Sequence, residues 1–473
     1  MVTGELAPYV DTGTGNVVAA LAKGLRQLGH DVTIAMPRLA ALEASGLLLS
    51  RRLTPLELSD GGEALVFDCQ LPSGVKLCAF DGGASLYADP EPFAADTDPD
   101  LLAERVGLVV KATHALCEQR AKADQAFDVV HLMDWIPAPV ALTGACSRVV
   151  LTITDATAQG SFPARSSDVL GIPKDRAGEA RAGNRVNALK AGISGADVIT
   201  TVSDAYAREL CTDGHAGGLT RALLDRAEAF VGVQLGVDYA LFNPATDPAL
   251  AHRYDAEDAG GKHVCKTALL RQLELPLDPD RPLITFAGPL TRAAGADWLV
   301  TAIPKILAND LVLVVPDVGD EALVAKLLTL SERYPDQLKL MPDYAAATSA
   351  SHQARGRCLE EKRKLLAASD MWLICPRAEH TGYELMLAQR YGAVPIVHAI
   401  GALEDSVVNA DAELATGTGF AFDDGSPKAL TAAVARAISA YRKGRWSALR
   451  RRVMRLDVSW DRPARRFQQL YRG

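Results

Sequence analysis

The sequence lacks the patterns by which cysteine and histidine usually bind a metal ion. Its eight cysteines form no C-x-x-C pair, and its nine histidines never stand four residues apart or beside a cysteine. Cysteines scattered along a chain of this length indicate reduced thiols in apolar surroundings. We therefore expect no metal site, no disulfide framework and no cofactor.

Long apolar runs and an excess of basic residues are missing as well. No run approaches the ~20 residues that span a bilayer, and no basic segment precedes an apolar stretch as in a signal peptide. The 50 lysines and arginines stand against 58 aspartates and glutamates, which leaves a net charge of -8. The sequence thus predicts a soluble, cytoplasmic protein that binds neither membranes nor nucleic acid.

One basic segment departs from this acidic average. Residues 442–472 contain ten arginines and one lysine against two aspartates. A nucleic-acid-binding patch is one interpretation. A solvated helix face is the favoured one, because aromatic residues are sparse there and the rest of the chain is acidic.

Short β-branched runs alternate with amphipathic segments along the 473 residues. This alternation predicts α/β domains with parallel sheets, and the length suits two domains of about 200 residues each. The expected strands are 31–36, 128–132, 149–153 and 198–202, then 283–286, 311–315, 338–340, 372–374 and 394–397. Residues 160–192 are expected to form a long loop with one helix, and 238–280 the junction. We predict two Rossmann-like, doubly wound domains facing a cleft at the carboxyl ends of their strands.

A glycine-containing loop in the first half could hold an anion. Thr12, Gly13 and Gly15 precede a helix expected over 17–28, and a helix N-terminus offers free N–H groups to a phosphate. A tight turn with Asn16 as the helix N-cap explains the same residues equally well.

A second loop of this kind lies in the other half of the chain. Residues 376–382 follow a buried strand and precede the helix expected over 383–391. Glu379 either points into the cleft or stabilises the dipole of that helix. One such loop in each half suggests a ligand that carries a diphosphate and a sugar.

Segments along the whole chain resemble bacterial glycogen synthases and plant starch synthases. In chain order they are Glu5–Gly13, Val129–Trp135, Leu189–Gly192, Thr201–Leu210, Gly236–Asp238, Phe242–Asp247, Arg253–Glu257, Lys262–Lys266, Arg390–Val397 and Val458–Trp460. The resemblance implies a retaining transfer of glucose from ADP-glucose to the non-reducing end of an α-1,4-glucan, which is the acceptor. It also implies the GT-B fold, with an acceptor-side domain at 1–240, a nucleotide-sugar domain at 241–456, and a helix at 457–473 that returns to the first domain.

The resemblance assigns roles to both loops. Glu379 matches the family's catalytic glutamate. Backbone around Thr12, Gly13, Gly15, Gly382 and Tyr383 would hold the donor, because these residues match the family's donor loops. In the family a short apolar strand precedes this point, but only Val2 and Thr3 stand here, so we expect the natural protein to start upstream of Met1.

Several positions that contact the donor in the family have changed in this chain. Each of them lacks the family's residue: Asp11 and Ala294 replace lysines, Pro289 an arginine, Thr154 a histidine, Leu235 an asparagine and Glu384 a threonine. The loss of the cations at 289 and 294, together with the carboxylates gained at 11 and 384, makes a phosphate site neutral or repulsive. Even ~3 kcal/mol per lost cation would slow turnover by roughly ten-thousandfold for the pair.

Two hypotheses follow from these changes. The first is a glycogen or starch synthase homologue whose transfer from ADP-glucose is weak or absent. The second is a non-catalytic paralogue that binds an α-glucan, or an authentic glycogen synthase, as a regulator or scaffold.

Overall fold

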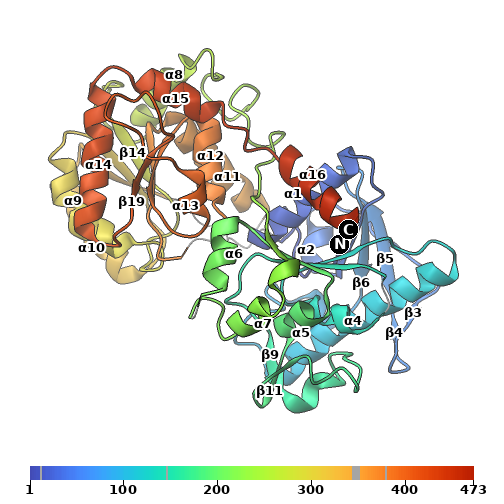
Figure 1. Ribbon diagram of the computed structural model, residues 1–473. Helices are drawn as coiled ribbons and strands as arrows, with labels where there is room; N and C mark the ends of the chain where they lie inside the picture. Colours follow the sequence, from blue (N-terminus) through green and yellow to red (C-terminus); the bar gives the residue numbers. More distant parts are fainter. Residues whose placement is uncertain (11–12, 145–146, 213, 343–351, 379–380, 473) are drawn as a thin grey trace. The chain divides into compact units, whose positions relative to one another are not determined.

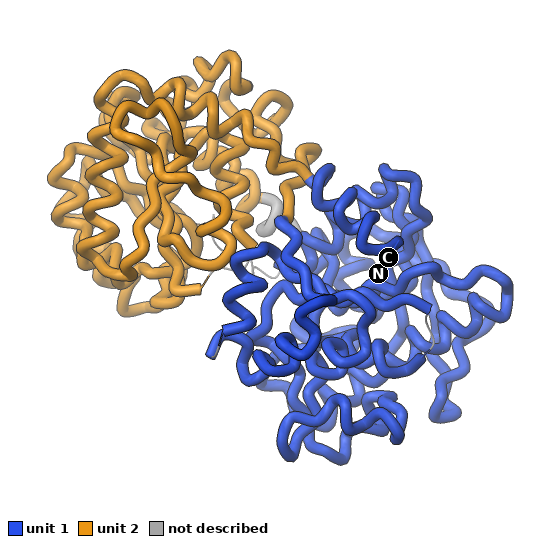
Figure 2. Tube along the Cα trace, viewed as in Figure 1, with its two compact units in different colours: residues 1–234, 460–473 blue, residues 235–459 orange. Residues whose placement is uncertain are grey.

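The computed structural model describes residues 1–10, 13–144, 147–212, 214–342, 352–378 and 381–472, with the side chains of 352–356 left aside. Its contacts divide the chain into two units. Unit 1 comprises residues 1–234 and 460–473, and unit 2 comprises residues 235–459 (Figure 2).

The strands of unit 1 form two groups, and three β-branched runs of the first half are among them as buried parallel strands, β7 (Val130–Met133), β8 (Val149–Ile153) and β12 (Val198–Thr201). The first group has four strands in the order β13-β12-β8-β7, in which β13 is Phe230–Gly232. Four others lie in the order β1-β6-β5-β2, formed by Thr33–Pro37, Lys76–Phe80, Val66–Gln70 and Ser50–Arg51. In this second group β1 and β6 are parallel, whereas β5 runs antiparallel to both of its neighbours.

Val2 joins these two groups of strands. It forms parallel bridges to Ala35 of β1 and to Leu132 of β7, and it is buried. Its amide donates to the carbonyl of His131 at 2.8 Å, and its carbonyl accepts from the amide of Met133 at 3.0 Å. Met1 and Thr3 on either side of it also bond Ala35 of β1, so residues 1–3 lie between the two groups of strands.

Helices of unit 1 follow the apolar periodicity. In α1 (Gly13–Gln27) Val17, Val18, Leu21 and Leu25 are buried, and Gly29 follows at φ +92°, the left-handed conformation that commonly ends a helix. The other helices are α2 (Ala40–Ala44), α3 (Ala84–Tyr87), α4 (Pro99–Lys122), α5 (Ala188–Gly195), α6 (Asp204–Leu210), α7 (Thr220–Leu224) and α16 (Asp461–Arg472). Short 3₁₀ turns are η1 (Ala138–Leu142), η2 (Ala164–Ser167) and η3 (Ala227–Ala229), and β3 (Leu56–Glu57) pairs with β4 (Glu63–Ala64).

The prediction of a long loop with one helix over 160–192 was incomplete: α5 begins there at Ala188, but the segment before it is not only a loop. A three-stranded antiparallel sheet lies there, in the order β10 (Arg181–Ala182), β11 (Arg185–Asn187) and β9 (Ser161–Pro163). These strands are two or three residues long and partly exposed, so they show no alternation of apolar and polar residues.

Unit 2 is built on one parallel sheet of six strands (Figure 1). Their order is β16 (Leu338–Met341), β15 (Val312–Pro316), β14 (Leu283–Phe286), β17 (Met371–Ile374), β18 (Val394–His398) and β19 (Phe420–Phe422). Chain order reverses between β14 and β17, and ligands of open α/β sheets bind at the carboxyl ends of strands at such a point.

Eight helices of unit 2 connect or cover these strands among the described residues. They are α8 (Gly261–Gln272), α9 (Ala296–Leu307), α10 (Glu321–Arg333), α11 (His352–Ala368), α12 (Tyr383–Tyr391), α13 (Ala402–Ser406), α14 (Pro427–Arg442) and α15 (Trp446–Met454). Helix α14 packs on α9, and α11 packs on α8. Within the described ranges, every helix is too short or too polar to cross a membrane.

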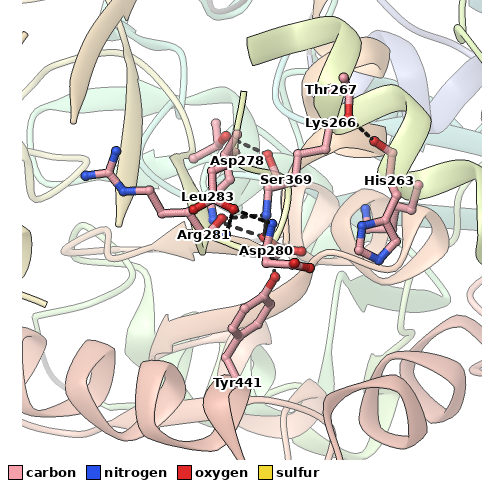
Figure 3. Close-up of polar contacts among 12 residues, drawn as sticks. His263, Lys266, Thr267, Asp278, Asp280, Arg281, Leu283, Ser369 and Tyr441 are labelled. Carbon is pink, nitrogen blue, oxygen red and sulfur yellow. Dashed lines mark hydrogen bonds and ion pairs between the residues drawn. The ribbon is translucent and has the colours of Figure 1, made fainter. Parts of the chain in front are cut away.

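A buried ion pair fixes α8 to the amino-terminal ends of β14 and β17 (Figure 3). Lys266 Nζ lies 2.6 Å from Asp370 Oδ2, and both side chains are buried. The same ammonium donates to the carbonyl of Arg281, and Asp370 Oδ2 accepts from the amide of Leu283. Helix α8 lies in the predicted junction at 238–280, and this contact makes it part of unit 2.

Candidate functional site

The loop after β14 carries two of the changed positions. Pro289 is exposed and Ala294 is half-buried, so neither contributes a charge at this edge of the sheet. Arg292 between them is also exposed. Gly295 follows at φ +77°, and a Cβ there would lie 2.0 Å from the carbonyl oxygen of Cys375, so only glycine fits this crossing of the two loops.

Arg377 is the cation that reaches this loop from the end of β17. Its guanidinium forms a two-pronged ion pair with Asp297, with both N–O distances 2.8 Å, and lies 4.2 Å from the centre of the Trp298 ring. The ion pair lowers the pKa of Asp297. The backbone amide of Arg377 donates to the carbonyl of Ala293 at 2.7 Å. Arg377 thus holds α9 and the loop in place and does not substitute for the cations missing at 289 and 294.

Helix α12 carries another changed position of unit 2, Glu384, in its first turn. Gly382 caps it at φ +63°, and the Tyr383 ring packs edge-on against Phe242. Glu384 in its first turn is ion-paired with Lys362 of α11. Glu384 adds a negative charge where the family has a threonine, and this pairing offsets that charge. Glu379 lies outside the described residues.

In unit 1 the predicted phosphate loop is only partly described, because Asp11 and Thr12 lie outside the described residues. Gly13 is exposed, with no atom within 4 Å of the position that a Cβ would take. Gly15 is buried, and its carbonyl accepts from the amide of Ala7 at 3.1 Å.

Thr154 lies in a cluster with two residues that sequence reasoning did not single out. Asp134 follows β7 at φ +58°, Thr154 follows β8, and Thr14 lies in the first turn of α1. Thr14 Oγ1 lies 2.7 Å from Asp134 Oδ2, and Thr154 Oγ1 lies 2.5 Å from the same oxygen. Burial raises the pKa of Asp134, while the bonds from Thr154 and Thr14 act in the opposite direction.

The remaining predicted position, Leu235, lies apart from these groups as a buried residue at the start of unit 2. It offers no polar group to a ligand. A signal for Asp134 was present, because it lies in the matching segment Val129–Trp135. The signal for Thr14 was a threonine within a glycine-containing motif.

The structure offers no evident metal site in the part of the chain that it describes: no three His, Cys, Asp or Glu side chains there converge. The seven described cysteines form no disulfide. Five are buried (Cys78, Cys117, Cys265, Cys358 and Cys375), and two are half-buried (Cys69 and Cys211).

Comparisons with known proteins find the same similarity along the whole chain. Residues 1–225 match the model of the starch synthase catalytic domain, and residues 272–451 match that of the group 1 glycosyl transferases. The glycogen synthase of Anaeromyxobacter sp. (strain Fw109-5) is 34% identical over 495 residues, which cover 100% of this chain and 98% of that protein. The glycogen synthase of Thioalkalivibrio sulfidiphilus is 34% identical over 486 residues, which cover 99% of this chain and 98% of that protein.

A solved structure extends the comparison to the fold. The catalytic domain of starch synthase IV from Arabidopsis thaliana, bound to ADP and acarbose, superposes with a TM-score of 0.84 at 25% sequence identity. The match covers 100% of this chain and 98% of that one.

Proposed function

Because the chain belongs to the glycogen and starch synthase family and has its GT-B fold, we propose that it transfers glucose from ADP-glucose to the non-reducing end of an α-1,4-glucan at a low rate. The observation that supports this most is the similarity over the full length of the relatives. Similarity over the whole length means that one chain contains both domains of the family, together with the loop at 12–16 in the first and the loop at 376–382 in the second.

The proposed roles follow the positions that match the family's motifs. Glu379 stabilises the sugar at its anomeric carbon, and backbone amides near Gly13 and Gly382 hold the diphosphate. Unit 1 serves the acceptor, and unit 2 serves the nucleotide sugar.

The low rate is proposed from the charges at the edge of unit 2. A departing diphosphate develops negative charge, and a site speeds its departure by placing cations or dipoles where that charge forms. The side chains of Pro289 and Ala294 carry no charge, and the guanidinium of Arg377 is already paired with Asp297. Arg292 is the exposed cation of this loop, and a single flexible side chain holds a diphosphate less firmly than two fixed ones.

The alternative is a non-catalytic paralogue that binds an α-glucan or an authentic glycogen synthase. Carbohydrate-binding surfaces commonly present exposed aromatic rings, whose flat apolar faces stack on sugars. Within the described residues no Phe, Tyr or Trp side chain is exposed. This favours transfer at the loop edges over binding of glucan on an outer surface.

Incorporation of labelled glucose from ADP-glucose into glycogen tests the proposal. The purified protein should give slow incorporation that Glu379→Ala abolishes. Glu413→Ala, which removes an exposed carboxylate of unit 2, is the matched control and should leave the rate unchanged. Failure to incorporate glucose, together with retained binding of glycogen, would favour the non-catalytic alternative.

A second experiment tests the reason for the low rate. The double substitution Pro289→Arg and Ala294→Lys should bind ADP-glucose more tightly, by about tenfold or more, because it returns two cations to the phosphate site. Thr301→Arg with Thr329→Lys adds the same charge to exposed helix positions and is the control. Equal gains in both double variants would argue that only net charge matters.

A further inference from the structure

The carboxylate of Asp134 has its acceptor positions filled by neighbours within unit 1. Oδ1 accepts from the amide of Thr154 at 2.6 Å and lies 3.4 Å from the amide of Asp155. Oδ2 accepts from the hydroxyls of Thr14 at 2.7 Å and Thr154 at 2.5 Å. A carboxylate offers about four acceptor sites, so this one has none left for a further donor.

The two threonine hydroxyls also contact each other. Thr14 Oγ1 and Thr154 Oγ1 lie 2.7 Å apart, which makes a closed ring of three oxygens with Asp134 Oδ2. Each hydroxyl therefore contacts both the carboxylate oxygen and the other hydroxyl.

The ring lies where a parallel sheet usually binds its ligand. Asp134 and Thr154 follow β7 and β8 directly, and Thr14 brings the first turn of α1 onto them. Carboxylates at this edge of a sheet are well placed to accept hydrogen bonds from ligand hydroxyls. Here Asp134 and Thr154 are buried, and the protein's own hydroxyls take that role.

We propose that Thr14 and Thr154 determine the specificity of this site by closing on Asp134, so that no sugar hydroxyl can bind the carboxylate unless the Thr14 hydroxyl leaves it. This inference rests on the proposed function, because it concerns the sugar that would bind at the edge of unit 1. It assigns Asp134 to holding α1 against β7 and β8, and it identifies Thr14 as the residue that a hydroxyl-bearing ligand must displace.

Calorimetric binding of ADP-glucose to Thr14 variants tests the proposal without measuring transfer. Thr14→Ala frees one acceptor site of a charged group, so binding should tighten by about tenfold. Thr14→Ser keeps the hydroxyl and should bind as the wild type does. Thr157→Val is the matched control, because the Thr157 hydroxyl bonds the neighbouring carboxylate of Asp155 and does not touch Asp134.

Two results would overturn the proposal. One is a Thr14→Ala protein that binds ADP-glucose no more tightly than the wild type or than Thr157→Val. The other is a folded Asp134→Asn protein that has lost ADP-glucose binding, which would show that the carboxylate already serves the ligand.

The outcome is separable from that of the proposed function. A Thr14→Ala protein that binds tightly but transfers no glucose would support the closure of the site and count against transfer. A wild-type protein that transfers glucose and needs the Asp134 carboxylate for binding would support the proposed transfer and contradict the closure of the site.

Discussion

At the scale of single residues, Lys266 of α8 shows how charge is stabilised inside unit 2 (Figure 3). Its ammonium is 2.6 Å from the Asp370 carboxylate, and the two side chains are 3% and 8% exposed. Lys266→Met would leave Asp370 buried without a cation, and we expect a loss of about 3–5 kcal/mol in the free energy of unfolding. Urea unfolding followed by the fluorescence of the buried Trp372 measures this loss.

Two further variants separate the charge from the packing. Adding Asp370→Asn to Lys266→Met removes the unpaired carboxylate and should recover part of the stability. Lys364→Met breaks half-exposed pairs with Glu360 and Glu361 and should cost under about 1 kcal/mol. A double variant less stable than Lys266→Met alone would contradict this account.

From the buried His131 we predict how the free energy of unfolding of unit 1 depends on pH. Burial lowers the pKa of its imidazole from 6.5 to about 3, and the ammonium of Met1 adds to the effect. Between these values the unfolded chain binds a proton that the folded chain does not, so stability falls as the pH drops below 6.5. The slope for this group is at most about 1.4 kcal/mol per pH unit.

The His131→Gln variant tests this dependence. Its stability lacks the imidazole contribution, so the advantage of the wild type over the variant should shrink as the pH falls from neutral to mildly acidic. The free energy of urea unfolding at several pH values measures the difference. A constant advantage of the wild type over His131→Gln across this pH range would refute the prediction.

At the scale of elements, four of the ten arginines of the basic segment donate to the protein's own backbone: Arg442, Arg445, Arg451 and Arg452. Arg452 of α15 donates to the carbonyls of Leu414, Ala415, Thr416 and Gly417, at distances from 2.6 to 3.2 Å. Arg442 donates likewise to the carbonyl of Asn309 at 2.5 Å. The favoured interpretation of a solvated helix face was therefore incomplete, because these cations anchor loops.

Replacing Arg452 tests this anchoring. Lysine keeps the charge but cannot reach four carbonyls at once, so Arg452→Lys should destabilise the loop at 414–417 by about 1–2 kcal/mol. Hydrogen exchange of backbone amides at 411–419 should accelerate correspondingly. Arg451→Lys is the control, because Arg451 makes one bond, from Nε to the carbonyl of Ala256. Equal acceleration in both variants would contradict the prediction.

The longer elements could be predicted from the sequence because each carries its own pattern. The expected strands at 149–153 and 283–286 and the helix at 383–391 have the predicted bounds. The missed strands include β5, β6, β9, β10, β11 and β19. The half-buried β5 and the two- or three-residue β9, β10, β11 and β19 leave no periodic signal, and β6 contains no β-branched residue.

The candidate site was less accessible to sequence reasoning. The contact of Thr14 with Asp134 spans 120 residues of sequence, and that of Lys362 with Glu384 depends on how α11 lies against α12. Motif matching identifies the residues that are replaced, but it does not show what the replacements bind. That is why Thr154 could be recognised as a change while its closure on Asp134 could not.

At the scale of the whole molecule, the chain leaves unit 1 after residue 234 and returns to it at residue 460. The two crossings pair within unit 2, where the amide of Val237 donates to the carbonyl of Val458 at 2.7 Å. The returning segment then forms α16, which packs on α1 and buries Phe467. Tyr471 Oη lies 2.7 Å from His131 Nδ1.

Deleting residues 460–473 should therefore destabilise unit 1, although unit 1 is otherwise encoded by the first half of the chain. The deletion uncovers α1 and His131 and removes the buried Trp460 and Phe467, each worth about 1.5–3 kcal/mol. Scanning calorimetry should show the transition of unit 1 at a lower temperature and that of unit 2 unchanged. Tyr471→Phe removes one hydroxyl and should cost only about 1 kcal/mol. If instead both transitions fall together, α16 stabilises the molecule as a single cooperative body, and the division into two units does not describe how it unfolds.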